Sequence, residues 1–150
     1  MTEEKKEPNL QILSQYIKDL SFEAPNLPEI LTSMQKAPEI AVNVDVQVQK
    51  KEENFTVALN IKAEAAEGKK TVFLTELSYE ALVLADVPAE HLEPVLLVEI
   101  PLLMFPFARA IISNITRDAG FPALQIAPID FAKLYLEKKQ QQAESTKTEK

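Results

Sequence analysis

The segment TVFLTELSYEALVL, residues 71–84, decides the fold because its side chains fit the period of two of a β-strand. One face of such a strand carries Phe73, Thr75, Leu77 and Tyr79, and the other carries Val72, Leu74, Glu76 and Ser78. The second face combines apolar Val72 and Leu74 with charged Glu76, which is unusual for a surface that meets only water. This strand therefore needs an explanation for both of its faces.

Three earlier segments also alternate. QYIKDLSFE, residues 15–23, places Tyr16, Lys18, Leu20 and Phe22 on one face and Asp19, Ser21 and Glu23 on the other. EIAVNVDVQVQ, residues 39–49, alternates valine with polar residues, and a third strand follows over residues 55–62. Gly68 accepts a positive φ at no steric cost, so EGKK predicts a hairpin turn into the segment 71–84. These patterns predict a four-stranded antiparallel sheet.

The second half of the chain predicts helices. Four prolines between residues 88 and 106 favour short helical turns separated by extended pieces over one uninterrupted helix. PFARAIISNITRDAG, residues 106–120, predicts a helix that Gly120 ends, with an apolar stripe of Phe107, Ala108, Ile111, Ile112 and Ile115. After the extended segment FPALQIAP, Asp130 can cap a last helix, FAKLYLEKKQQQ. A sheet followed by C-terminal helices gives the α+β class.

The length of 150 residues suits one domain, which we place at residues 10–139. Residues 1–9 are expected to be a flexible N-terminus, and residues 140–150 a disordered polar tail. No uninterrupted apolar run approaches the roughly 20 residues of a membrane span. The charged start MTEEKKEPNL does not resemble a signal peptide, so we expect a cytoplasmic protein without direct membrane insertion.

The charge balance favours a basic partner. The chain has 16 basic and 23 acidic residues, and residues 8–137 carry 10 of the former and 18 of the latter. Such an acidic body repels nucleic acid, whose affinity for proteins depends on clustered lysine and arginine. A partner with a basic surface is the better electrostatic match.

The residues of common catalytic sites are scarce. Gly68 and Gly120 are the only glycines, so a phosphate-binding glycine-rich loop is not possible, and the chain has no cysteine. The single histidine, His91, lies among glutamates and prolines, which favours an exposed loop over a general base. We expect no metal, no cofactor and no enzymatic activity. Two functional classes remain: a protein that acts by binding or assembly, and an enzyme whose site cannot be read from the sequence. The composition favours the first.

Two segments resemble the SecB family of bacterial export chaperones. They are YIKDLSFEAPN at residues 16–26 and FPFARAIISNITRDAGFPALQIAPIDFAKLYLEKKQQQ at residues 105–142, and the resemblance spans residues 10–142. It implies a four-stranded antiparallel sheet backed by helices, assembled as a homotetramer that is a dimer of dimers. It also implies an ATP-independent holdase that keeps unfolded secretory precursors translocation-competent and delivers them to the motor ATPase SecA.

The resemblance implies positions for two binding surfaces. The family's docking surface for SecA matches Asp19 and Glu23 in KDLSFEAPN and Leu74 and Glu76 in FLTE. Val72 and Leu74 would then supply apolar contact area while the three acids attract a basic tail of the motor. Candidates for the client-binding groove are Phe22, Leu27, Ile30, Leu31, Met34 and Phe55.

The sequence also departs from the family pattern. It has no tryptophan in the crossover loop, and its segment SYEALVLADVPAE replaces a glycine-bearing turn, so the groove lining and subunit packing can differ in detail. A solitary SecB-like chaperone with a dedicated client, such as an antitoxin, is the alternative to export. An enzyme or small-molecule carrier on the same sheet is a third possibility.

Overall fold

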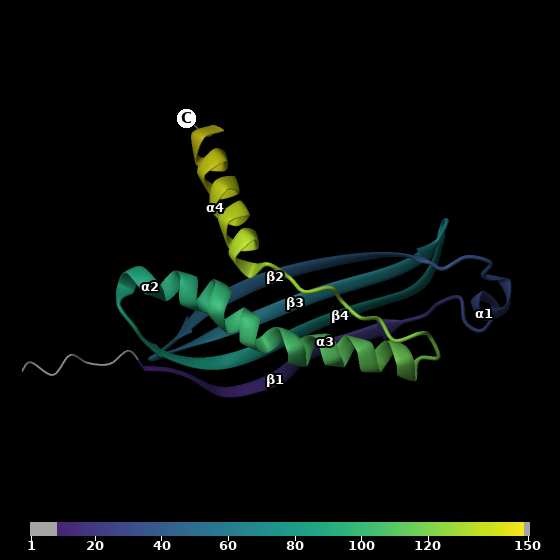
Figure 1. Cartoon of the computed structure of the whole chain (residues 1–150), viewed down its shortest axis with the longest axis horizontal. Coiled ribbons are helices and arrows are strands. Elements are labelled where there is room, and N and C mark those ends of the chain that lie inside the picture. The colour runs from purple at the N-terminus through teal and green to yellow at the C-terminus, as the bar shows by residue number, and fades with distance from the viewer. Residues whose placement is uncertain (1–8, 149–150) are drawn as a thin grey trace, which may run out of the picture.

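Four long strands form the framework of the computed structural model, which describes residues 9–148 (Figure 1). The strands are β1 (Asn9–Glu23), β2 (Glu39–Lys51), β3 (Asn54–Glu67) and β4 (Lys70–Asp86). The helices are α1 (Glu29–Ser33), α2 (Ala89–Pro94), the π-helical turn η1 (Val95–Glu99), α3 (Ile100–Asp118) and α4 (Phe131–Thr148). The predicted α+β class is confirmed. The N-terminus expected to be flexible, residues 1–9, lies outside the described residues except for Asn9.

The strands form one antiparallel sheet in the order β1-β4-β3-β2. Glu67 pairs with Lys70 across the predicted turn, and Gly68 has φ of 59°, so the role of this glycine is confirmed. β1 and β2 are the two edges. The sheet therefore has an inner face, against which α3 packs, and an outer face on the opposite side.

A bulge in β1 changes the predicted facing of this strand. Ile17 pairs with Tyr79 and Asp19 pairs with Ser78, so Lys18 is an extra residue between them. Leu20 consequently lies on the inner face while Tyr16, opposite Glu80, lies on the outer face. The prediction that Tyr16 and Leu20 share a face is wrong because one added residue reverses a period of two.

The helical region is more continuous than the sequence predicted. α2, η1 and α3 follow one another without an extended segment, so the predicted separate turns are wrong (Figure 1). Ile100 donates its N–H to the carbonyl of Val95 in the π turn directly before Pro101, where the missing proline donor falls in the first turn of α3. Pro106 lies inside α3 on its exposed side.

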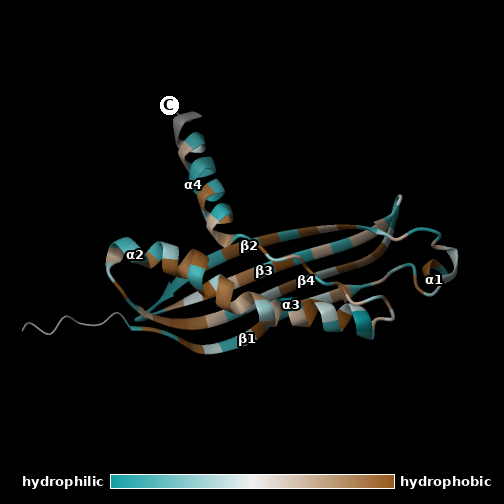
Figure 2. Cartoon of the chain, in the orientation of Figure 1, coloured by the Kyte–Doolittle hydropathy of each residue, from teal (hydrophilic) through white to brown (hydrophobic). Residues whose placement is uncertain are grey.

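This helical run, Ala89–Asp118, is long and apolar enough by length and composition to cross a membrane. The prolines and Glu99 had predicted an interrupted segment instead. A helix in the core of a soluble protein passes the same test, however, and this run packs along the sheet (Figure 2). Its length is therefore weak evidence for a membrane span.

The main core lies between α3 and the inner face. Ile100, Met104, Ala108 and Ile112, each four residues apart, are fully buried against β3 and β4 residues such as Leu59 and Leu77. The predicted stripe correctly contains Ala108 and Ile112. Phe107 is wrong as a core residue, because it is 54% exposed on the other side of α3.

Helix α4 continues to Thr148, beyond the end predicted near Gln142. The added residues 143–148 include alanine, glutamate and lysine, which are good helix formers. Asp130 caps the helix as predicted, since its Oδ1 accepts the N–H of Lys133 at 3.0 Å. Lys138 anchors α4 to β2 by an ion pair with Asp45 and by a 3.1 Å hydrogen bond to the carbonyl of Val46.

Candidate docking and client-binding surfaces

The four residues predicted to dock the motor lie together on the outer face. Glu23 pairs with Leu74, and Ser21 pairs with Glu76, across β1 and β4. Residues that pair directly in an antiparallel sheet project to the same face, and Asp19 is two residues from Ser21. Asp19, Glu23 and Glu76 are exposed, and Leu74 is half-buried among them. We call Asp19, Glu23, Leu74 and Glu76 the acidic patch.

Lys62 on β3 is a cation inside this acidic surface that sequence reasoning missed. It pairs with Glu76, and its Nζ lies 3.9 Å from Glu76 Oε1. Both side chains are about half exposed, so water and salt weaken the interaction. The alternation of β3 already placed Lys62 on one face of its strand, but only the register shows that this is the face of Glu76.

Val72 does not contribute to the exposed surface. It is fully buried in a second core cluster with Ile30, Phe73 and Phe121. The prediction that Val72 supplies apolar contact area is therefore wrong, because Val72 is an extra residue of β4 between the paired Thr71 and Phe73 and packs in the cluster of Ile30. Leu74 is the apolar residue of β4 that remains accessible within the acidic patch.

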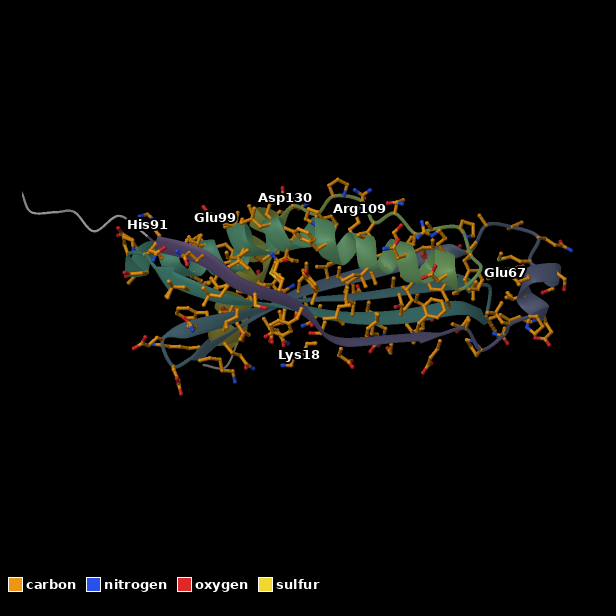
Figure 3. The ribbon with its side chains drawn as sticks, turned by 90° about the horizontal axis from the view of Figure 1, so that it is seen from below. Lys18, Glu67, His91, Glu99, Arg109 and Asp130 are labelled. Carbon is orange, nitrogen blue, oxygen red and sulfur yellow. The ribbon has the colours of Figure 1, made fainter. Side chains whose placement is uncertain are left out.

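Glu80 forms a polar cluster on the same face. Its carboxylate accepts a hydrogen bond from the Tyr16 hydroxyl, and Lys18 Nζ lies 3.6 Å from its other oxygen. The hydrogen bond to Glu80 raises the pKa of Tyr16 to about 12, with burial and the negative charge of Glu80 adding to the effect. Figure 3 shows Lys18 beneath the sheet, on the side opposite Arg109 and Asp130.

An apolar pocket of about 480 Å³ lies at the α1 end of the sheet, on the inner face. The segment after α1, the start of β2 and the segment after α3 surround it, with Met34, Ile40, Phe73, Phe121 and Leu124 in its walls. Phe73 contacts Phe121 with ring centroids 5.5 Å apart and stacks on Phe22 at 5.7 Å. The pocket is thus built on a chain of three aromatic rings.

The predicted client-binding residues divide into three groups. Phe22, Leu27, Ile30 and Met34 belong to the cluster that supports this pocket, but only Met34 lines it, and Ile30 is 2% exposed. Leu31 is 51% exposed on α1 without lining the pocket. Phe55 packs in the main core and pairs with Val83, toward the other end of β4. The six residues therefore do not form one groove.

Several residues of the pocket were not predicted. Phe121 and Leu124 lie in FPALQIAP, a segment that sequence reasoning described as extended and did not connect with α1. Ile40 alternates on the apolar side of β2, yet it remains 46% exposed because no helix covers it. Which apolar residues stay uncovered at this end of the sheet depends on the packing of distant segments, which the sequence pattern does not show.

No group of three or more histidine, cysteine or acidic side chains lies close enough to hold a metal ion within residues 9–148. His91 is exposed on α2, and its Nε2 lies 3.6 Å from Glu90. The arrangement offers surfaces for macromolecules: acids beside a leucine on the outer face, and an apolar pocket on the inner face.

The sequence matches a family model over residues 3–142, that of the preprotein translocase subunit SecB. The chain belongs to the SecB family. Protein-export protein SecB of Granulibacter bethesdensis is 46% identical over 149 residues, which cover 93% of this chain and 87% of that protein. The SecB protein of Parvibaculum lavamentivorans is 49% identical over 136 residues, with 89% and 81% covered.

A solved structure shows the same fold. The SecB-like chaperone of Mycobacterium tuberculosis, in complex with a peptide from an antitoxin, has a TM-score of 0.66 and 13% identity. The match covers 80% of this chain and 90% of that chain. The SecB fold predicted from the two sequence segments is therefore confirmed, and the protein is a SecB-type export chaperone.

Proposed function

We propose that this protein is an ATP-independent holdase that acts in the bacterial cytoplasm as a homotetramer, without enzymatic activity. It binds unfolded secretory precursors and delivers them to SecA. The observation that carries this proposal is the separation of the acidic patch from the apolar pocket on opposite faces of one sheet. A client and a motor can then be held at the same time.

Phe73 and Leu74 support this separation. They are consecutive in β4, and Phe73 lines the apolar pocket while Leu74 lies in the acidic patch. The pocket is suited to apolar segments of varied sequence because Met34 and the leucine and isoleucine walls can repack. The acidic patch is suited to a basic segment of the motor, with Leu74 supplying apolar contact.

Uncovered apolar surface supports the tetramer. Leu102, Leu103 and Phe107 are each more than half exposed on α3, on the side away from the sheet. β1 is an edge strand of 15 residues with exposed Leu13 and Ile17, and an edge of this length is a template for pairing with another copy. A dimer of dimers would cover both surfaces, and would also leave no apolar helix face for a membrane.

Export is favoured over a dedicated antitoxin client by the relatives. The proteins that are 46–49% identical are named protein-export proteins, whereas the neighbour with the antitoxin peptide is 13% identical and indicates the fold alone. The presence of all four residues of the acidic patch also favours docking to SecA.

The test compares two binding reactions of the same variant. Glu76→Lys should weaken binding to SecA by about tenfold or more, because it replaces an attractive charge by a repulsive one. Binding of an unfolded precursor, measured by light scattering without nucleotide, should be unchanged. Equal SecA affinity of Glu76→Lys and the native protein would overturn the docking assignment, and failure to bind the precursor would overturn the holdase.

A further inference from the structure

A second hollow adjoins the acidic patch on the outer face. It has a volume of about 240 Å³ and is lined by Lys18, Asp19, Gln47, Thr56, Ser78 and Glu80, among others. It shares Asp19 and Ser78 with a neighbouring hollow of about 330 Å³ that contains Glu76 and Lys62. The acidic patch and the hollow of Glu80 therefore form one continuous surface.

Glu80 gives this hollow a carboxylate that is largely removed from water. The residue is 7% exposed, and it has Tyr16 and Lys18 as partners. Lys18 is not a strong neutralising partner, because its Nζ is 3.6 Å away and its side chain is 60% exposed. A carboxylate can accept several hydrogen bonds, so Glu80 retains acceptor capacity toward the hollow.

Thr56 is a second polar side chain of this hollow with little exposed surface. It is 8% exposed and lines the hollow, yet its hydroxyl makes no hydrogen bond to any residue between 9 and 148. The oxygen of this hydroxyl is not fully enclosed by protein, so a group in the hollow can reach it. The hollow therefore holds the hydroxyl of Thr56, which has no partner in the described residues, beside the carboxylates of Asp19 and Glu80, of which Glu80 is shared with Tyr16 and Lys18.

We propose that this hollow receives the guanidinium group of an arginine from the basic docking partner. Arginine offers five donors in a planar group and is more weakly hydrated than lysine, so it suits a hollow with several acceptors. The proposal rests on the proposed function, in which the outer face binds a basic segment. It adds a specific subsite, at which Glu80 and Thr56 select arginine.

Methyl NMR of the intact assembly can test the hollow without SecA. The probe is N-acetyl-arginine N-methylamide, and the reporters are the methyl groups of Thr56 and Ala58, which both line the hollow. Thr75 and Ala81, buried on the inner face, serve as reference methyls. We expect saturable shifts at Thr56 and Ala58 only. The neutral citrulline analogue should produce none, and equal shifts with citrulline would overturn the proposal.

Two variants and one matched control locate the binding. Glu80→Gln keeps an oxygen for the Tyr16 hydroxyl and should weaken arginine binding about tenfold, because it removes the charge from the hydrogen bond. Thr56→Val should weaken arginine binding less than Glu80→Gln does. The methyl group of Ala58 is the reporter for this variant, because the Thr56 methyl group is replaced. Glu64→Gln makes the same charge change at an exposed outer-face position and should have no effect. Equal weakening by Glu64→Gln and Glu80→Gln would indicate nonspecific attraction and contradict the subsite.

SecA binding distinguishes a failure of the arginine subsite from a failure of the proposed function. If Glu76→Lys weakens SecA binding while arginine does not bind at the hollow, docking stands and the subsite is wrong. If arginine binds at the hollow but SecA does not bind the protein, the subsite stands and the proposed function is wrong.

Discussion

Glu76 on β4 lies opposite Lys62 on β3, with Lys62 Nζ 3.9 Å from Glu76 Oε1. The cation that weakens the field of the acidic patch thus comes from the neighbouring strand. Lys62→Gln should tighten binding to SecA by about two- to fivefold at low salt, because it removes repulsion of a basic segment. Lys133→Gln makes the same change on exposed α4 and should leave the affinity unchanged. Calorimetry at two salt concentrations checks this, and weaker binding by Lys62→Gln would contradict it.

Ile40 offers a test of the apolar pocket that spares the core. It lines the pocket and is 46% exposed, so Ile40→Ser should reduce affinity for unfolded precursors by about three- to tenfold with little loss of stability. Leu31→Ser removes a similarly exposed side chain that does not line the pocket. Fluorescence titration with a labelled precursor compares them. Greater loss with Leu31→Ser would place the client-binding surface on α1.

Leu103 tests assembly. It is 55% exposed on the apolar side of α3, and a charge there should prevent another subunit from packing on the helix. Leu103→Asp should therefore lower the mass measured by light scattering from four chains to two or one, while far-UV circular dichroism stays unchanged. Asn114→Asp adds the same charge at an exposed polar position of α3 and should keep the native mass. A tetrameric Leu103→Asp would exclude this helix face from assembly.

Met104, next to Leu103, is fully buried against the sheet. Met104→Ala should lower the free energy of unfolding by about 2–5 kcal/mol, because it removes buried apolar atoms and leaves a cavity. Urea denaturation at fixed protein concentration measures the change. A loss below about 1 kcal/mol would mean that α3 does not pack as described.

Tyr16 should titrate with a pKa of about 12, because its hydroxyl donates to Glu80. Absorbance at 295 nm follows the three tyrosines, and Tyr16→Phe identifies the contribution of Tyr16. Because the folded-state pKa lies above the ordinary value of 10.0, this bond stabilises the protein fully below pH 10. The stabilisation should be lost as the pH rises from 10 to 12. In Glu80→Gln the pKa should fall toward 10, and an unchanged pKa would contradict the assigned cause.

The sequence predicted the sheet well because alternation and turn chemistry are local properties. Gly68 and Asp130 have the roles that their residue types suggested. The facing of Tyr16 could not be predicted, since a bulge depends on the partner strand. Continuity through Pro101 was missed because proline rules describe an ideal α-helix, and the chain uses a π turn.

The two surfaces differ in how far the sequence predicted them. The resemblance located the residues of the acidic patch, and strand register brings them together. The opposing charge of Lys62 and the burial of Val72 depend on contacts between distant segments. The separation of Phe55 from Phe22 depends on such contacts too, because the two residues lie toward different ends of the sheet and pack in different clusters.

The extra residue Lys18 divides the stretch Tyr16–Phe22 of β1 into two parts whose side chains alternate in opposite phase. In a saturation mutagenesis scan across Tyr16–Phe22, the inner-facing positions should be odd-numbered before Lys18 and even-numbered after it. A single period of two across the whole stretch would contradict the bulge. Deleting Lys18 would make Ile17 and Asp19 consecutive opposite Tyr79 and Ser78, so this part of the ladder would become regular without any change of facing. Tyr16 should therefore keep its hydrogen bond to Glu80 in the deletion variant, which should lose only the ion pair of Lys18 and the local bend of β1.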